Sequence, residues 1–264
     1  MLNILVCVKQ VPDVNLVKMD PVTGSLIRKG VPAILNPNDA NAVEAAVQLK
    51  ERYGGTVSCM TMGPEQAAEA LKECLAAGAD KAFLLSDKAF ANADTLATSY
   101  VITNAAKMLG TYDLILCGKE SLDGATGQMP SQIAERLNTS QLSSVLRVLE
   151  VNEKERCITV QRELEKGVQT AKGKLPCLLT VEKTYYRPRI PSLKSWKASR
   201  KVKIPAFNSQ TIKDLDTEQI GDPGSPTKVP RTYPHEAKGL CQFINEGSSY
   251  KNTQAMLALL AGEL

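Results

Sequence analysis

The sequence predicts an α/β fold in which a parallel sheet is flanked by helices, with added antiparallel strands and a C-terminal arm. Short apolar runs without polar alternation recur along the first half of the chain, as in parallel strands that are covered on both faces. Each run is followed by a segment whose apolar residues recur at helical spacing. Four such units in succession favour a parallel sheet with right-handed crossovers.

Local signals place the elements of the first half. The predicted strands are residues 4–8, 56–62, 82–85 and 114–117. The predicted helices begin near residues 38, 63, 95 and 129. The Gly54-Gly55 pair and Gly78 end the first two helices, because glycine readily adopts the left-handed backbone of a helix end. We expect Asn41 and Glu44 to form a capping-box-like pair at the start of the first helix.

Beyond residue 137 the pattern changes to strands that alternate or pair as antiparallel strands do. These are residues 144–151, 157–164 and 168–171, with a further core strand at 178–182. Residues 192–201 then form a short basic helix, for which a plain solvated face is the simpler interpretation. Leu193 and Trp196, three residues apart, would share one side of that helix and favour a binding surface.

We expect two parts in the chain, an α/β domain at residues 1–204 and a C-terminal part at residues 205–264. From residue 205 to 234 the composition shifts to Pro, Gly, Asp, Ser and Thr, which predicts a linker without a core. Residues 251–264 carry apolar residues at helical spacing but have no adjacent core in the sequence. We therefore expect a helical arm that packs on a partner subunit, with folding back onto its own domain as the alternative.

Composition and charge exclude several classes of protein. The net charge is only +4 and aromatic residues are 5% of the chain, so we expect no nucleic-acid binding. The apolar N-terminus is too short for a membrane span and has no basic region before it, so we expect neither a signal peptide nor membrane insertion. Seven scattered cysteines without a Cys-x-x-Cys pair fit core residues of a cytoplasmic protein. The single histidine, His235, has no ligand partner nearby, so no metal site is expected.

The strongest functional signal is the stretch 112–137. A buried strand ends in a polar loop, residues 118–127, with two carboxylates, a lysine, two hydroxyls and three glycines, and a helix follows. Loops between the carboxyl end of a parallel strand and a helix bind anions, because free amides and the helix dipole favour negative charge there. We interpret this loop as the phosphate site of an adenine-containing cofactor, with an ordinary turn-rich connection as the alternative. Its spacing fits neither a Walker A loop nor the G-x-G-x-x-G dinucleotide fingerprint.

Several short motifs together resemble the β subunit of electron transfer flavoproteins. They are residues 4–9, 11–12, 36–39, 44–45, 62–64, 78–80, 118–128, 174–176 and 188–189. The resemblance covers residues 1–205 in the right order and spacing, which makes it far more specific than any single motif.

The resemblance implies a heterodimer with an electron transfer flavoprotein α subunit, in which this chain holds an adenine nucleotide at the loop edge of the sheet. In one branch of the family the nucleotide is a structural AMP. In the electron-bifurcating branch it is FAD, which NADH reduces and which passes one electron to the α-subunit flavin and one to a low-potential acceptor such as ferredoxin. Carried over by position, the nucleotide contacts are Cys7, Asn36, Asp39, Met62, Gly118, Lys119, Glu120, Ser121, Leu122, Asp123, Gly124, Ala125, Thr126, Gly127, Gln128 and Met129.

Other stretches resemble the bifurcating branch more than the AMP branch. They are residues 23–31, the core of the loop at 123–128, and a second strand-to-helix loop, in which Phe90, Asp94 and Thr95 are possible flavin or NAD contacts. Two departures from many bifurcating members are Ala125, where an acidic residue is common, and Pro130, where a glycine is common. The resemblance favours FAD, with AMP as the alternative.

Residues 187–201 correspond to the recognition loop of the family, which anchors the α/β pair to an acyl-CoA dehydrogenase-like flavoprotein by one leucine. Leu193 falls on that position, and we expect Trp196 to belong to the same docking surface. A single aliphatic anchor among basic residues suits a weak, fast contact in which charge sets the association rate.

The resemblance thus implies a subunit of an NAD-linked flavoprotein oxidoreductase complex. No catalytic side chain and no turnover by the chain alone are expected, because the chemistry belongs to the flavin. Two alternatives from other classes remain at this point: an ATP-binding module without redox activity, and a scaffold without a ligand.

Overall fold

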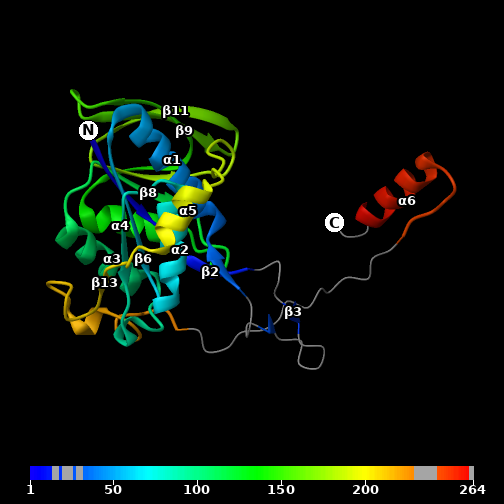
Figure 1. Ribbon diagram of the computed structural model, residues 1–264. Coiled ribbons are helices and arrows are strands. Elements are labelled where there is room, and N and C mark those ends of the chain that lie inside the picture. The colour runs from blue at the N-terminus through cyan, green and yellow to red at the C-terminus, as the bar shows by residue number, and fades with distance from the viewer. Residues whose placement is uncertain (14–17, 20–25, 28–31, 229–242, 262–264) are drawn as a thin grey trace.

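The computed structural model describes residues 1–13, 18–19, 26–27, 32–228 and 243–261. Within these residues the main sheet has nine strands in the order β11-β10-β9-β12-β8-β1-β6-β7-β13 (Figure 1). The strands are β1 Leu2–Cys7, β6 Gly55–Met62, β7 Lys81–Leu85, β8 Leu114–Gly118, β9 Ser140–Asn152, β10 Cys157–Leu164, β11 Gly167–Lys174, β12 Cys177–Val181 and β13 Ala206–Phe207. The predicted α/β fold is confirmed.

All neighbouring strands from β13 across to β9 are parallel, whereas β9, β10 and β11 form antiparallel hairpins. The hairpins therefore extend one edge of the parallel sheet, as the sequence predicts. Strand β9 pairs in parallel with β12 before it pairs antiparallel with β10, so it belongs to both parts of the sheet. Two small ribbons join β2 (Gln10–Pro12) to β5 (Ala33–Leu35) and β3 (Lys18–Met19) to β4 (Leu26–Ile27).

Helices cover both faces of the sheet (Figure 1). They are α1 Pro37–Tyr53, α2 Ala68–Ala77, α3 Thr95–Leu109 and α4 Met129–Leu137, followed by α5 Leu193–Arg200 and α6 Ser249–Ala261. Because side chains alternate along a strand, β1 contributes to two cores. Ile4 and Val6 pack with α1 and α2 on one face, and Leu5 packs with α3 and α4 on the other.

The ends of the first two helices agree only partly with the sequence signals. Gly78 ends α2 with a left-handed φ of +119°, as expected. The expected capping box of α1 is wrong, because Asn36 is the N-cap residue and makes no side-chain cap bond. Asn41 Nδ2 instead donates to the Pro37 carbonyl at 2.6 Å, and Glu44 accepts hydrogen bonds from Gln48 and Arg189.

The segment expected to start the linker packs on the domain. Strand β13 pairs with β7, and Ile212 and Ile220 are buried in the core on the side of α3 and α4. Ser225 is also buried, and its Oγ accepts a hydrogen bond from the Asp94 amide at 2.8 Å. Two isolated isoleucines in a polar stretch give no periodic signal, so the composition favoured a linker over these residues.

Helix α6 confirms the expected helical arm, and none of its described residues is buried. Met256, Leu257, Leu259 and Leu260 are each about half exposed. What covers this apolar side stays a prediction. None of the helices in the described part of the chain has the length and hydropathy to cross a bilayer.

Candidate functional site

A cavity of about 580 Å³ lies at the carboxyl ends of β1, β6 and β8 and at the starts of α1, α3 and α4. Its volume is within the range of small-molecule and cofactor sites. The predicted site residues that line it are Cys7, Asn36, Asp39, Met62, Gly118, Lys119, Glu120, Ser121, Gly124, Thr126, Gly127, Gln128 and Met129, together with Phe90, Asp94 and Thr95. The structure thus brings together residues of five separate stretches of the sequence.

Asp39, in the first turn of α1, joins three elements at this cavity. Its carboxylate accepts hydrogen bonds from the Lys9 amide at 2.8 Å and from the Gly118 amide at 3.1 Å. Burial raises the pKa of Asp39 to about 7, although the hydrogen bonds from Asn36, Lys9 and Gly118 act in the opposite direction. The start of α1 is therefore fixed to the ends of β1 and β8 through one buried carboxyl group.

Gly118 is required for this close approach. A Cβ atom at Gly118 would lie 2.5 Å from Asp39 Oδ1 and 2.6 Å from the carbonyl carbon of Asn38. Both distances are well inside van der Waals contact, and one of the two atoms is backbone. Only glycine therefore lets the loop leave β8 so close to the start of α1.

Asn36 holds the loop that follows Gly118. Its Nδ2 donates to the Glu120 carbonyl at 2.9 Å, and its Oδ1 accepts from the Leu122 amide at 3.3 Å. Asn38 Nδ2 donates to the same Glu120 carbonyl at 2.9 Å. Two neighbouring amide side chains at the start of α1 thus fix the first half of the loop.

Three predicted contacts, Leu122, Asp123 and Ala125, do not line the cavity. Leu122 is exposed, and Ala125 has a left-handed φ of +46° with its amide bonded to the Ser121 carbonyl. The Asp123 carboxylate accepts a hydrogen bond from Lys9 Nζ at 2.7 Å. Lys9 itself lines the cavity, so Asp123 acts on the site through that lysine.

The second half of the loop presents free backbone donors. The amides of Thr126, Gly127, Gln128 and Met129 have no hydrogen-bond acceptor among the described residues. All four residues line the cavity, and they lead directly into the first turn of α4. Gly127 has a left-handed φ of +62°, which glycine adopts without strain. Free amides at a helix start favour a bound anion such as a phosphate group.

A polar bridge joins this loop to the predicted second loop. Thr95 Oγ1 donates to Gln128 Oε1 at 3.0 Å and accepts from Gln132 Nε2 at 3.2 Å. Asp94 caps α3 by accepting hydrogen bonds from the amides of Leu96 and Ala97. The two loops are therefore walls of one cavity.

Sequence reasoning missed several lining residues. They are Val8, Lys9, Asn92, Ala93, Thr98, Ile102, Cys117, Pro130, Ile133 and Thr227. Lys9 could have been found, because it directly follows the first strand on the loop edge of the sheet. Thr227 had no such signal: its amide donates to Asp94 at 3.0 Å across 133 residues of sequence.

The cysteines of the described residues are all free thiols. Cys7 and Cys117 are register partners on the neighbouring parallel strands β1 and β8, and both line the cavity. A hydrogen bond with Cys7 and burial raise the pKa of the Cys117 thiol. These residues act as apolar lining, in agreement with the expected core role. In the described part of the chain, no group of His, Cys, Asp and Glu residues is arranged to hold a metal ion.

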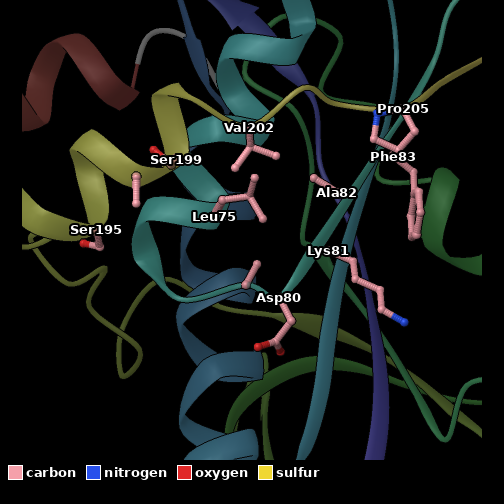
Figure 2. Close-up of a pocket in the computed structure, with 11 residues that line it drawn as sticks. Leu75, Asp80, Lys81, Ala82, Phe83, Ser195, Ser199, Val202 and Pro205 are labelled. Carbon is pink, nitrogen blue, oxygen red and sulfur yellow. The ribbon is translucent and has the colours of Figure 1, made fainter.

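The predicted docking residues lie on α5, away from this cavity. Leu193 exposes 68% of its surface and Trp196 exposes 45%. A second cavity, of about 420 Å³, lies beside α5 and is walled mainly by apolar and small side chains, among them Leu75, Phe83 and Val202 (Figure 2). It shares no residue with the first cavity, which is the one that combines free amides with charged groups.

Comparisons with known proteins identify the family of this chain. The family model described as the electron transfer flavoprotein domain matches residues 23–211. The caffeyl-CoA reductase-Etf complex subunit CarD of Acetobacterium woodii is 46% identical over 92% of this chain and 92% of its own length. An electron transfer flavoprotein subunit beta of Thermoanaerobacterium thermosaccharolyticum is 44% identical over 88% of this chain and 87% of its own length. The protein FixA of Sinorhizobium fredii is 39% identical, over 90% and 86% respectively.

The family match covers residues 23–211, which include the loop at residues 118–128 and the second loop, and the identities extend over most of the chain. The protein belongs to the electron transfer flavoprotein family, as a β subunit.

Proposed function

We propose that this β subunit binds FAD in the cavity at the loop edge of its sheet. In a heterodimer with an electron transfer flavoprotein α subunit, it carries electrons between NADH, ferredoxin and a partner acyl-CoA dehydrogenase-like flavoprotein. The partner class follows from the resemblance of residues 187–201 and from the relative in Acetobacterium woodii, which is named as part of a complex with caffeyl-CoA reductase. In this proposal the chain takes part in electron bifurcation.

One observation carries the choice of FAD over AMP. The cavity is bounded both by the phosphate loop and by the second loop with Phe90, Asp94 and Thr95, and Thr95 is hydrogen-bonded to Gln128. A nucleotide monophosphate would use the free amides and the residues near Cys7 and Met62. The second loop adds space and the aromatic side chain of Phe90 beyond the phosphate region. This arrangement suits a dinucleotide that ends in a flavin ring.

The residues of the cavity fit such a ligand. The free amides from Thr126 to Met129 would receive phosphate oxygens, and Lys9 would add positive charge at the same edge. Cys7 and Met62, at the ends of neighbouring parallel strands, would flank the adenine. FAD, when bound, supplies the hydride and single-electron chemistry, whereas the protein fixes its position and potential.

A structural AMP remains the second candidate, because Ala125 and Pro130 depart from the pattern of many bifurcating members. The free amides would serve a monophosphate equally well. An ATP-binding module without redox activity is no longer proposed, because the chain belongs to a flavoprotein family.

The experiment that tests the proposal is a count of cofactors in the heterodimer purified with its α subunit. The absorption spectrum is recorded, the cofactors are released with acid, and FAD and AMP are quantified per heterodimer. Two FAD molecules and no AMP are expected. One FAD with one AMP would establish the alternative, and a colourless heterodimer would contradict both.

A further inference from the structure

Helix α5 lies beside an incompletely filled groove. The cavity of about 420 Å³ is bounded by α5, the end of α2 and the first half of β7 (Figure 2). Helix α5 contributes only Ser195, Ala198 and Ser199 to its wall, and these side chains are small. The side of α5 that faces this cavity carries only small side chains, so the contacts at the two ends of the helix also contribute to its position.

At its C-terminal end, α5 is held by an ion pair and by the chain that follows it, since β13 pairs with β7 and the Leu84 amide donates to the Pro205 carbonyl at 3.0 Å. Arg200 forms an ion pair with Glu69 near the start of α2, and its guanidinium stacks over the Trp196 ring at 5.2 Å from the ring centre. Glu69 also pairs with Lys72 and is about half exposed. Such exposed pairs contribute little, so this contact alone does not fix the helix.

The segment before α5 is held by Arg189. Its Nε and Nη2 donate to the two oxygens of Glu44 at 2.8 and 3.1 Å, and its backbone amide donates to Glu44 at 3.2 Å. Its Nη1 and Nη2 also donate to the two oxygens of Glu51 at 2.6 and 3.1 Å. Both carboxylates belong to α1, the helix that begins at the proposed cofactor cavity. One guanidinium group therefore bridges two residues that lie two turns apart on this helix.

The burial of Glu44 makes this contact strong. Its side chain is 6% exposed, and Gln48 donates a further hydrogen bond to it at 2.7 Å. Burial would raise the pKa of Glu44, but the hydrogen bonds from Arg189 and Gln48 outweigh it and hold that pKa below its usual value. A buried charge with several charge-assisted partners resists displacement far more than an exposed ion pair.

The charges around α5 separate into two groups. Residues 183–203 contain eight Lys and Arg residues and no Asp or Glu. Arg189 and Arg200 turn toward carboxylates of α1 and α2, whereas the six others form no ion pair among the described residues. The remaining six are Lys183, Arg187, Lys194, Lys197, Lys201 and Lys203. The two arginines thus serve the fold and leave the other six cations for a partner.

We propose that Arg189 is the positioning residue of the docking surface, which it holds in a binding-ready place by joining the segment before α5 to Glu44 and Glu51. The inference rests on the proposed function in that α5, with Leu193, is the surface that meets the partner flavoprotein. Arginine suits this role because its planar fork presents five donors and can bind both carboxylates in a bidentate way, whereas the ammonium group of lysine has three donors at a single point.

The position of α5 can be measured without a partner or a cofactor. Trp196 is the only tryptophan of the chain and lies on α5, so its fluorescence reports on this helix alone. In the full chain, Arg189→Ala should lower the anisotropy of Trp196. Its quenching by acrylamide should rise by up to about twofold, because 45% of Trp196 is already exposed. Arg189→Lys should fall between wild type and Arg189→Ala.

Two further variants keep this test decisive. Glu51→Gln removes only the more exposed carboxylate and leaves no buried charge unpaired, so it should fold normally and show a smaller change of the same sign. Arg52→Ala is the matched control, since Arg52 is also on α1 but its guanidinium binds the Leu149 carbonyl. Unchanged Trp196 signals in both Arg189→Ala and Glu51→Gln would overturn the proposal.

A second measurement links position to docking. The heterodimer is assayed with the caffeyl-CoA reductase of Acetobacterium woodii as the probe. The KM for this protein should rise roughly tenfold in Arg189→Ala, with kcat and the rate of reduction by NADH unchanged, because a mobile surface must be ordered on binding. A rise in Leu193→Ala but not in Arg189→Ala would overturn the positioning role. If Leu193→Ala docks normally, the proposed docking function fails, while the Trp196 result still stands on its own.

Discussion

Lys9 Nζ lies 2.7 Å from Asp123 Oδ1 and so connects the end of β1 to the loop after β8. The two residues are 114 positions apart in the sequence. Lys9 lines the cavity at the loop edge of the sheet and Asp123 does not, so the carboxylate holds the lysine and the loop from outside the cavity. This relationship changes what is expected of Asp123, from a direct ligand contact to a support of the site.

We expect Asp123→Asn to lower the cofactor content of the purified heterodimer, because both Lys9 and the loop lose a restraint. Burial raises the pKa of Asp123, but hydrogen bonds and the charge of Lys9 outweigh it, so the pKa is lowered overall. The stabilisation is therefore present above the unfolded pKa of 3.8 and is lost as the pH falls through the lower folded value. FAD and AMP are counted at pH 7. Glu155→Gln, which removes an exposed ion pair with Lys172, is the control, and equal cofactor content in both variants would contradict the expected role.

Asp39 gives the opposite pH dependence. Its folded pKa of about 7 lies above the unfolded value of 3.8, so between these values the folded chain binds a proton that the unfolded chain has released. The free energy of unfolding should therefore fall as the pH rises across this window. In Asp39→Asn this component of the slope should be absent. Urea unfolding of both proteins from pH 4 to 8 measures it, and parallel pH profiles would show that Asp39 does not titrate in this range.

Gly118→Ala should destabilise the chain by about 1–3 kcal/mol, because the new methyl group would overlap Asp39 and the backbone of Asn38. Gly124→Ala is the matched control in the same loop. A Cβ at Gly124 would lie 3.5 Å from Ser121 Oγ, which is an ordinary contact. Thermal unfolding compares the two variants. Similar melting temperatures for both would mean that the loop can move away from α1 at little cost.

Leu193→Ala should weaken electron transfer to a partner flavoprotein while reduction by NADH stays at the wild-type rate. The side chain is 68% exposed and buries little surface in this chain, so its loss should leave stability unchanged. Steady-state kinetics with varied partner concentration separates the two steps. Leu164→Ala, an exposed leucine at the end of β10, should behave as wild type. A loss of both activities in Leu193→Ala would argue against a pure docking role.

Removal of α6 tests the proposed arm. A chain that ends at Gly247 lacks the exposed side formed by Met256, Leu257, Leu259 and Leu260. It should unfold at the same urea concentration as the full chain, because α6 buries none of its described residues. It should no longer co-purify with the α subunit if the arm packs there. Normal co-purification would assign the arm to another contact.

The elements of the first half could be predicted because their signals are local. Apolar runs, helical spacing and glycine ends such as Gly78 all lie within a few residues of the feature that they specify. The cavity could be predicted as well, since the carboxyl ends of parallel strands meet at one edge of the sheet.

What could not be predicted depends on contacts between distant residues. Glu44 was expected to cap its own helix, but Arg189 binds it across 145 positions. Ile212 and Ile220 are buried in a segment whose composition resembles a linker. Asp123 was expected to face the ligand, and only the fold shows that Lys9 is its partner. In each case the residue type was informative, but the neighbour that gives it a role is set by tertiary packing.

Helix α1 separates two parts of this subunit whose sequences can vary independently in evolution. It carries Asp39 in its first turn and Glu51 near its last, about 18 Å apart at the helical rise per residue. This fixed spacer separates the edge proposed for the cofactor from the anchor of the docking segment. If residues 183–203 dock the partner as proposed, substitutions among their six cations that form no ion pair in the described part of the chain would alter which redox protein is recognised without disturbing the other end, so that one electron-carrying module could be adapted to several reductases.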